Sequence, residues 1–159
     1  MNKALLLVRP ALALIAAVSL GACVSKQVAP VEQTPAMSSV APTLALEQFL
    51  SAANAAARND AEGIRAMGRL FGTRDAPIIN IDSREIVEQR MYTLAVLLKH
   101  NTYEIQGEQV VPGRMSEAKR FLVELTLPDR KVVVPFTMVL SKGNRWLVES
   151  FEAEKITNG

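Results

Sequence analysis

The side chains in this sequence that could do chemistry are few and scattered. His100 is the only histidine among the 159 residues. A lone imidazole can act as a general base at the mouth of a pocket. His100 follows Lys99 near the predicted end of a helix, where the helix dipole favours a cation. Because no carboxylate is placed by the sequence to orient the ring, we favour the alternative, a structural histidine at a helix end.

Two other groups of polar residues could line a ligand site. Arg74 and Asp75 lie in a predicted loop, and loops on a rigid scaffold often carry function. A turn or a local ion pair is the favoured alternative for them. Tyr92 and Tyr103 could each point a hydroxyl group into a pocket, although packing in the core or at its rim is the favoured alternative. The candidate ligand-binding residues are therefore Arg74, Asp75, Tyr92, His100 and Tyr103.

Other kinds of site are excluded by missing motifs and by charge. The sequence has no glycine-rich phosphate loop, Cys-x-x-Cys pair, serine nucleophile elbow or His-Glu pair, and we expect no catalytic residue, no metal and no cofactor. One cysteine cannot form an internal disulfide. The first 22 residues contain two basic residues, Lys3 and Arg9, so 16 basic (18 − 2) and 16 acidic residues remain after them. The missing basic excess argues against nucleic-acid binding.

The first 22 residues have the three parts of a signal peptide. Residues 1–10 carry two positive charges, residues 11–20 form an apolar run, and the small residues Gly21 and Ala22 come next. The apolar run is too short to cross a bilayer, which needs roughly 20 residues. The sequence therefore predicts export, with removal of residues 1–22.

The residues Leu20-Gly21-Ala22-Cys23 resemble a bacterial lipobox. The resemblance implies cleavage between Ala22 and Cys23, diacylglycerol on the Cys23 sulfur, and acylation of the new amino group by a chain such as palmitate. Several acyl chains anchor a protein firmly, because each buried CH₂ contributes about 0.8 kcal/mol. With Val24 rather than Asp after the cysteine, the resemblance implies an outer-membrane lipoprotein that faces the periplasm. A plain signal peptide with an incidental cysteine is the alternative.

A tether and one domain are predicted to follow. Residues 23–43 contain Pro30, Pro35 and Pro42 together with Ser, Thr and Gln, but no aromatic residue and no helical or alternating period. This composition is typical of a flexible tether; an ordered arm packed on the domain is the alternative. Residues 44–157 are predicted to form the domain.

The first half of the domain has helical periodicity. Apolar residues recur at helical spacing after Thr43, which is a suitable N-cap. A second, short helix is predicted to follow Asp60 as its cap, and a short strand to follow at residues 78–81. The clearest helix is predicted to begin at Asp82, with Glu three residues later as in a capping box, or at Ser83.

From Tyr103 onward the apolar period changes to two, which is typical of strands. Strands are predicted at residues 103–112, 121–127, 131–141 and 146–154. The last three are joined by tight turns and form an antiparallel meander. The predicted fold class is therefore α+β, with N-terminal helices packed on one face of a curved antiparallel sheet of about four strands.

The third predicted strand is apolar on both faces. Val133, Pro135, Thr137 and Val139 share the face opposite Phe136. A strand that is apolar on both sides is normally covered on both sides, and the helices are expected on only one. We therefore expect Val133, Thr137 and Val139 to form an interface in a homodimer. Scattered surface valines are the alternative.

The order of these elements resembles the nuclear transport factor 2-like superfamily. Residues 59–71 resemble its early helix pair, and Gly143-Asn144-Arg145-Trp146-Leu147-Val148 resembles its final hairpin. The resemblance implies a cone in which a bent sheet wraps a long helix, often around a pocket, and dimers formed through the sheet. A cystatin-like domain shares much of this pattern. The superfamily includes ketosteroid isomerases, polyketide cyclases, dehydratases and non-catalytic members, and none of its catalytic sets maps onto this sequence.

The sequence predicts a non-catalytic, lipid-anchored protein whose periplasmic domain binds a small apolar ligand or an envelope protein. The alternative is an enzyme of the isomerase, cyclase or dehydratase kind that uses a pocket in the cone. Such an enzyme would need a buried acidic or histidine side chain in a closed pocket with a shifted pKa. A docking module would instead have a filled interior and an exposed apolar patch.

Overall fold

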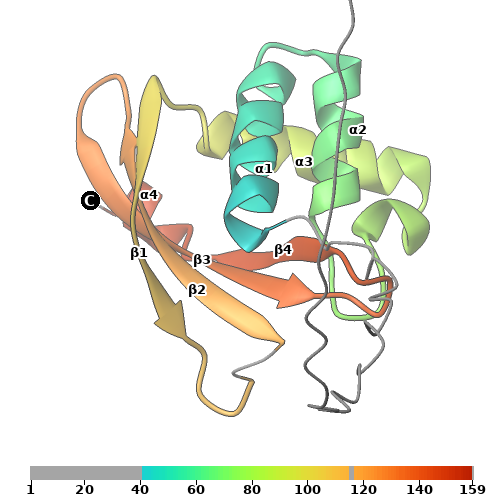
Figure 1. Ribbon diagram of the computed structural model, residues 1–159. Helices are drawn as coiled ribbons and strands as arrows, with labels where there is room; N and C mark the ends of the chain where they lie inside the picture. Colours follow the sequence, from blue (N-terminus) through green and yellow to red (C-terminus); the bar gives the residue numbers. More distant parts are fainter. Residues whose placement is uncertain (1–40, 115–116, 159) are drawn as a thin grey trace, which may run out of the picture. The chain divides into compact units, whose positions relative to one another are not determined.

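The computed structural model describes residues 41–114 and 117–158, and the predictions for residues 1–40 lie outside this range. The predicted α+β class is confirmed, with helices first and strands after them (Figure 1). The elements are α1 (Pro42–Ala56), α2 (Ala61–Leu70), the 3₁₀-helix η1 (Ile78–Asn80), α3 (Arg84–Leu97), β1 (Thr102–Val110), β2 (Ala118–Thr126), β3 (Lys131–Leu140), β4 (Trp146–Phe151) and α4 (Glu154–Thr157).

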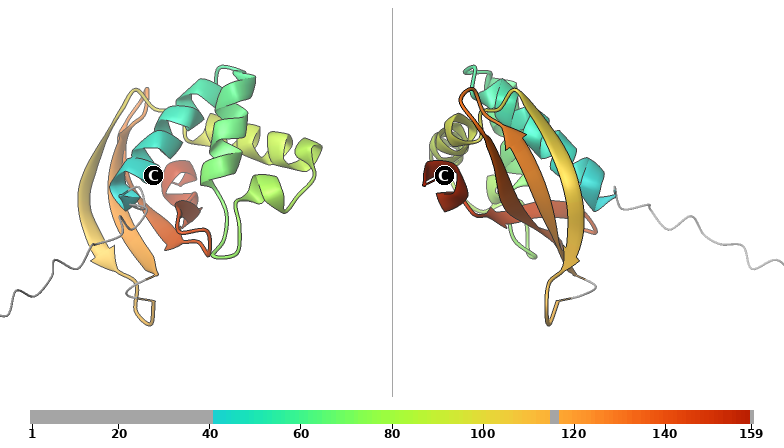
Figure 2. Two further views of the ribbon diagram at one scale, coloured as in Figure 1. Left: turned by 45° about the vertical axis from the view of Figure 1, so that its right-hand side comes forward. Right: turned by 90° about the vertical axis from the view of Figure 1, so that its left-hand side faces the viewer.

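The four strands form one open antiparallel sheet in the order β1-β2-β3-β4. The sheet is curved, and α1, α2 and α3 lie on one side of it (Figure 2). Two register shifts interrupt the pairing, one between Ile105 and Gly107 of β1 and one between Thr137 and Met138 of β3. Such bulges bend a strand and increase its twist, so they help the sheet to curve.

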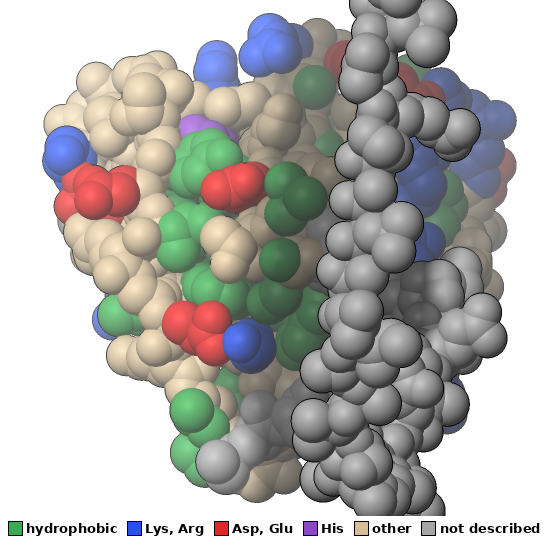
Figure 3. Space-filling model, viewed as in Figure 1, with side chains coloured by type: hydrophobic (Ala, Val, Ile, Leu, Met, Phe, Trp, Pro, Cys, Tyr) green, Lys and Arg blue, Asp and Glu red, His purple; other side chains and the backbone are tan. Residues whose placement is uncertain are grey.

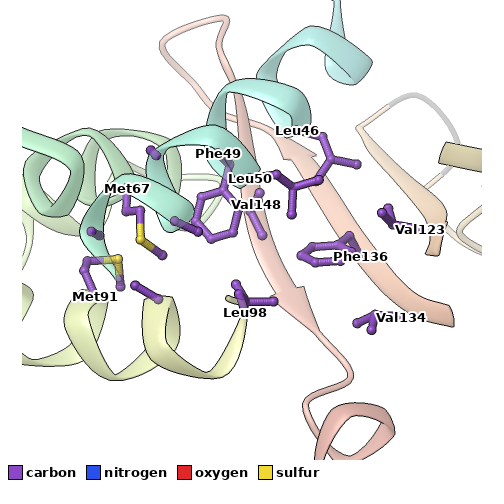
Figure 4. Packing of buried hydrophobic residues seen from close by; sticks show 14 of the residues in the cluster. Leu46, Phe49, Leu50, Met67, Met91, Leu98, Val123, Val134, Phe136 and Val148 are labelled. Atoms are coloured by element: carbon purple, nitrogen blue, oxygen red, sulfur yellow. The ribbon is translucent and has the colours of Figure 1, made fainter. Parts of the chain in front are cut away.

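The space between α1 and the sheet is filled by side chains. Leu46, Phe49 and Leu50 of α1 are completely buried and point toward the sheet, where Val123 and Phe136 lie (Figure 4). Fully burying side chains of this kind stabilises the fold by about 1.5–3 kcal/mol each. The space between the helix and the curved sheet is therefore a packed core.

The hairpin between α1 and α2 follows from local sequence signals. Asn59 adopts a left-handed backbone conformation with φ of 63°, which asparagine tolerates better than most residues. The carboxylate of Asp60 then accepts a hydrogen bond of 3.0 Å from the backbone N–H of Glu62, so the predicted N-cap is confirmed. The two helices pack closely at Gly63, where an added Cβ would lie 2.6 Å from the backbone nitrogen of Ala56.

Some predicted boundaries are wrong. Helix α1 begins at Pro42 with Ala41 in the N-cap position, so Thr43 is not the cap; proline suits the first turn because its missing N–H has no helical partner there. The strand predicted at residues 78–81 is the 3₁₀-helix η1 instead. The cap position of α3 falls on Ser83, the second of the two predicted residues.

The C-terminal end of the domain also differs from the prediction. Strand β4 ends at Phe151, and residues 154–157 form the short helix α4. Ile156 of α4 is buried in the core cluster, and the Arg130 guanidinium donates a hydrogen bond to its carbonyl oxygen. A single buried residue in a four-residue helix is too little for a periodic pattern, so the sequence did not indicate it.

Candidate functional site

Among the described residues, only His100 and Ser141 are buried polar side chains. Every described carboxylate keeps some exposed surface. No group of three or more His, Cys, Asp or Glu residues in the described ranges is arranged to hold a metal ion. The search for a site therefore turns to His100 and to the surface.

The side chain and backbone of His100 are held by Asn54, which lies 46 residues earlier in the chain. The Leu98 carbonyl can only accept, so the His100 Nδ1 at 2.7 Å from it carries the proton. The Asn54 amide then donates to the His100 Nε2 at 3.2 Å and to the His100 carbonyl at 3.1 Å. The His100 backbone N–H donates in turn to the Asn54 Oδ1 at 3.1 Å.

This network leaves His100 no free nitrogen with which to act as a base. The orientation of the Asn54 side-chain amide is unambiguous. The backbone N–H of His100 can only donate, so the Asn54 atom that faces it must be the amide oxygen. The ring also meets Tyr103 edge-on, with 5.6 Å between the ring centroids. His100 therefore attaches the end of α3 to α1.

A shallow hollow of about 440 Å³ opens beside this network. Burial raises the pKa of the Tyr103 phenol, and the nearby Glu47 carboxylate raises it further. Of the five candidate ligand residues, only His100 and Tyr103 come together here. The lining residues are Ser51, Asn54, Arg58, His100, Asn101, Thr102 and Tyr103.

Arg74 and Asp75 lie elsewhere and are occupied by ion pairs. The Arg74 guanidinium donates to Glu117 at 2.6 Å, and the Asp75 carboxylate lies 2.6 Å from the Lys142 ammonium. That ammonium holds the pKa of the Asp75 carboxyl below its usual range. These partners are distant in sequence, so the loop is tied to the turn after β3 and to the start of β2.

Helix α3 packs on α2, α1 and η1 and extends beyond the sheet (Figure 2). It carries exposed apolar side chains at Ile86, Tyr92 and Val96. A hollow of about 350 Å³ lies beside it, lined by Phe71, Ile78, Gln89, Arg90, Met91, Thr93 and Leu94. Tyr92 is 40% exposed and is not among the residues that line this hollow.

The predicted interface residues on β3 differ in accessibility. Val133 is 39% exposed and Thr137 is partly exposed, but Val139 is completely buried. Val139 is paired in register with Ala118 of β2 and Leu147 of β4, and neither of these is exposed. A second copy could therefore reach only Val133 and Thr137 of the three predicted residues.

Further apolar surface lies between α1 and β1, which we call the α1–β1 flank and define by Leu44, Glu47, Tyr103 and Ile105. Leu44 is 45% and Tyr103 is 37% exposed, and Ile105 is half-buried. Figure 3 shows hydrophobic side chains gathered on this side of the molecule with acidic side chains among them. Sequence reasoning missed this flank and Asn54. The available signal was a polar stripe that runs along α1 into the turn after it, in which Glu47, Ser51, Asn54 and Arg58 recur at helical spacing.

Comparisons with known proteins do not identify the site. No protein-family model, no curated protein and no solved structure matches this chain. In the part of the chain that the structure describes, no helix is both long and apolar enough to span a membrane.

Proposed function

We propose that this protein is a membrane-tethered docking module. Lipid on Cys23 anchors it in the bacterial outer membrane, a tether presents the domain to the periplasm, and the domain binds another envelope protein. In this proposal the surface of the domain recognises a partner protein, and the domain does not catalyse a reaction of a small molecule.

The packed interior is the single observation that carries this proposal. The position that a ligand would take in a cone-shaped domain is filled by Leu46, Phe49, Leu50 and Phe136, all completely buried. A ligand pocket usually measures about 300–1,000 Å³ and encloses most of its ligand. In the described residues the hollows of that size are open and lie on the surface.

The ionisable groups support the same choice over an enzyme. A catalytic acid or base in this kind of fold would be buried and aimed into a closed site. The described carboxylates all keep exposed surface, and every polar atom of His100 is engaged by Asn54 or Leu98. Exposed apolar side chains, which a docking surface requires, occur on α3 and on the α1–β1 flank.

Native mass spectrometry of residues 35–159, produced in a bacterial periplasm, tests the docking role. This range contains the whole described core. We expect the measured mass to equal the mass of the polypeptide, alone or as a multiple. Excess mass that disappears on denaturation would reveal a captured small molecule and would contradict the proposal.

Fractionation of cells that produce the full chain tests the anchor. Cys23→Ala removes the sulfur that the lipid requires, so the protein should move from the membrane fraction to the soluble fraction. Ser25→Ala, two residues away, is the matched control and should remain in the membrane. A Cys23→Ala protein that stays in the membrane would contradict a lipid anchor at this position.

A further inference from the structure

We propose that the free edge of β1 binds an extended, basic segment of another protein as an additional strand. This inference rests on the docking function proposed above and names the surface and the chemistry of the partner. It depends on three features of the described residues: an open sheet edge, an uncovered apolar flank beside it, and acidic groups on both sides of it.

The two edges of the sheet differ. At β4 the edge is covered, because Phe71 forms a parallel bridge to Val148 and the Gly72 N–H donates to the Val148 carbonyl at 3.0 Å. β1 is nine residues long, pairs only with β2, and has seven exposed positions in the pattern eeeieieee. The outer side of such a strand presents backbone N–H and C=O groups that can pair with another extended chain.

Apolar side chains continue from this edge onto the α1–β1 flank. Tyr103 and Ile105 of β1 pair with Leu125 and Val123 of β2, so all four lie on the face that carries the core. Leu44 of α1 adds exposed apolar surface on the other side of the flank. Figure 3 shows the hydrophobic side chains gathered on this side of the molecule. Because side chains alternate along a strand, every second residue of an added strand would face this flank.

The charged side chains of α1 and β1 are acidic, although Arg58, just after α1, lines the hollow beside Tyr103. Helix α1 and β1 together contain three glutamates, Glu47, Glu104 and Glu108, and no lysine or arginine. Glu108 is paired with Lys119 of β2 at 2.6 Å. In the described ranges neither Glu47 nor Glu104 forms a salt bridge, since the Lys131 ammonium close to Glu104 is bonded to Glu124 instead.

The two acidic groups without a salt bridge face different sides of the edge. Glu104 is opposite Glu124 on the outer face of the sheet, whereas Glu47 acts electrostatically on Tyr103 from the inner flank. An added strand therefore meets a carboxylate on each of its two faces. Lysine or arginine on both faces of the segment, with apolar residues over Tyr103 and Ile105, matches this surface.

A second copy of the chain matches it less well. Two β1 strands placed side by side would bring together two edges that each carry Glu104 and Glu108 and no lysine or arginine. Like charges that are brought close together in this way repel each other. The edge therefore favours a partner of opposite charge.

Titration of residues 35–159 with two synthetic peptides tests the inference. The basic probe is acetyl-KKVTVKV-amide and the acidic probe is acetyl-EEVTVEV-amide, and the readout is the amide signals in nitrogen-15 correlation spectra. In an extended strand the charges of each probe fall on both faces, and its valines all lie on one face. With the basic probe we expect saturable shifts confined to β1 and the α1–β1 flank, and slower hydrogen exchange at alternate β1 amides. The acidic probe should bind at least about tenfold more weakly, because attraction is replaced by repulsion.

Charge variants show whether the two carboxylates contribute. Glu47→Gln and Glu104→Gln should each raise the Kd of the basic probe about two- to fivefold, the range for a solvent-exposed ion pair. Glu154→Gln in α4, also exposed, is the matched control and should leave the Kd unchanged. Unchanged dispersion of the amide signals in each variant will show that it is folded.

Four outcomes would overturn the inference: no saturable binding of the basic probe at millimolar concentration, equal binding of both probes, shifts that map to α3, or β1 signals that depend on protein concentration without peptide. The last would make a second copy the occupant. If the basic probe does not bind and the native mass equals that of the polypeptide, only the proposal for the β1 edge is wrong. If the native mass reveals a captured small molecule, the proposed docking function is wrong.

Discussion

Replacement of Asn54 by alanine should strongly destabilise the domain, although Asn54 lies on the surface side of α1. The substitution removes three hydrogen bonds to His100: those to Nε2 (3.2 Å), to the carbonyl oxygen (3.1 Å) and from the backbone N–H (3.1 Å). A buried polar group left without a partner costs about 1–3 kcal/mol. Water in the adjacent hollow can replace some of these hydrogen bonds, so we expect the free energy of unfolding to fall by about 2–3 kcal/mol in total. Such a loss lowers the Tm by about 10–15 °C in a domain of this size.

Urea unfolding followed by the fluorescence of Trp146, the only tryptophan and largely buried, measures this loss. Asn101→Ala is the matched control, because Asn101 lines the same hollow and is exposed; it should change stability by less than about 0.5 kcal/mol. Nitrogen-15 spectra of the imidazole should show the proton on Nδ1 of His100 in the native protein. Equal losses in the two variants, or a ring protonated on Nε2, would refute the assigned network.

Three further predictions concern packing and charge. Gly63→Ala should destabilise the domain by about 1–3 kcal/mol, because the new Cβ would lie 2.6 Å from a backbone nitrogen of α1. The control Gly107→Ala should not show that loss, because no atom lies within 4 Å of its new Cβ. Equal losses of the two variants in urea unfolding would contradict the close contact between α1 and α2. Leu50→Ala should cost about 2–5 kcal/mol and leave an apolar cavity that binds benzene, which calorimetry should detect in the variant and not in the native chain; benzene binding to the native chain would mean that the interior is not filled. Hydrogen bonds from Arg69 and Arg65 lower the pKa of the Glu62 carboxyl. The stabilisation from these pairs is therefore fully present above the ordinary carboxyl pKa and is lost as the pH falls through the lowered pKa of Glu62. Salt screens the pairs, so a proton-detected titration of Glu62 whose midpoint does not rise on adding salt would contradict the ion pairing.

Much of the fold was predictable from short-range patterns. The change from helical to alternating periodicity near Tyr103 coincides with the observed change from α3 to β1. The Asp60 cap was predictable because its hydrogen bond spans only two residues. The boundary at Pro42 was missed because Thr43 offers a competing local signal, and only one of two adjacent residues can begin the helix.

The candidate site was much less predictable. His100 and Tyr103 were brought together, but Arg74 and Asp75 are bound in ion pairs whose partners lie 43 and 67 (142 − 75) residues away. Val139 was expected on an accessible face because of its alternation with Phe136. Alternation along a strand shows which residues share a face of the sheet, but not what covers that face. In the structure Val139 is completely buried.

The sequence by itself determined the class and order of the long helices and strands and the antiparallel meander, because these depend on periodicity and turn residues within about ten positions. It also contains the only basis for the proposed lipid anchor at Cys23. Tertiary structure alone decided that the interior is packed, that Asn54 holds His100, and that among the described residues the edge of β4 is covered while that of β1 is open. Those properties depend on contacts between residues tens of positions apart, and their geometry is determined only when the whole chain has folded around one core.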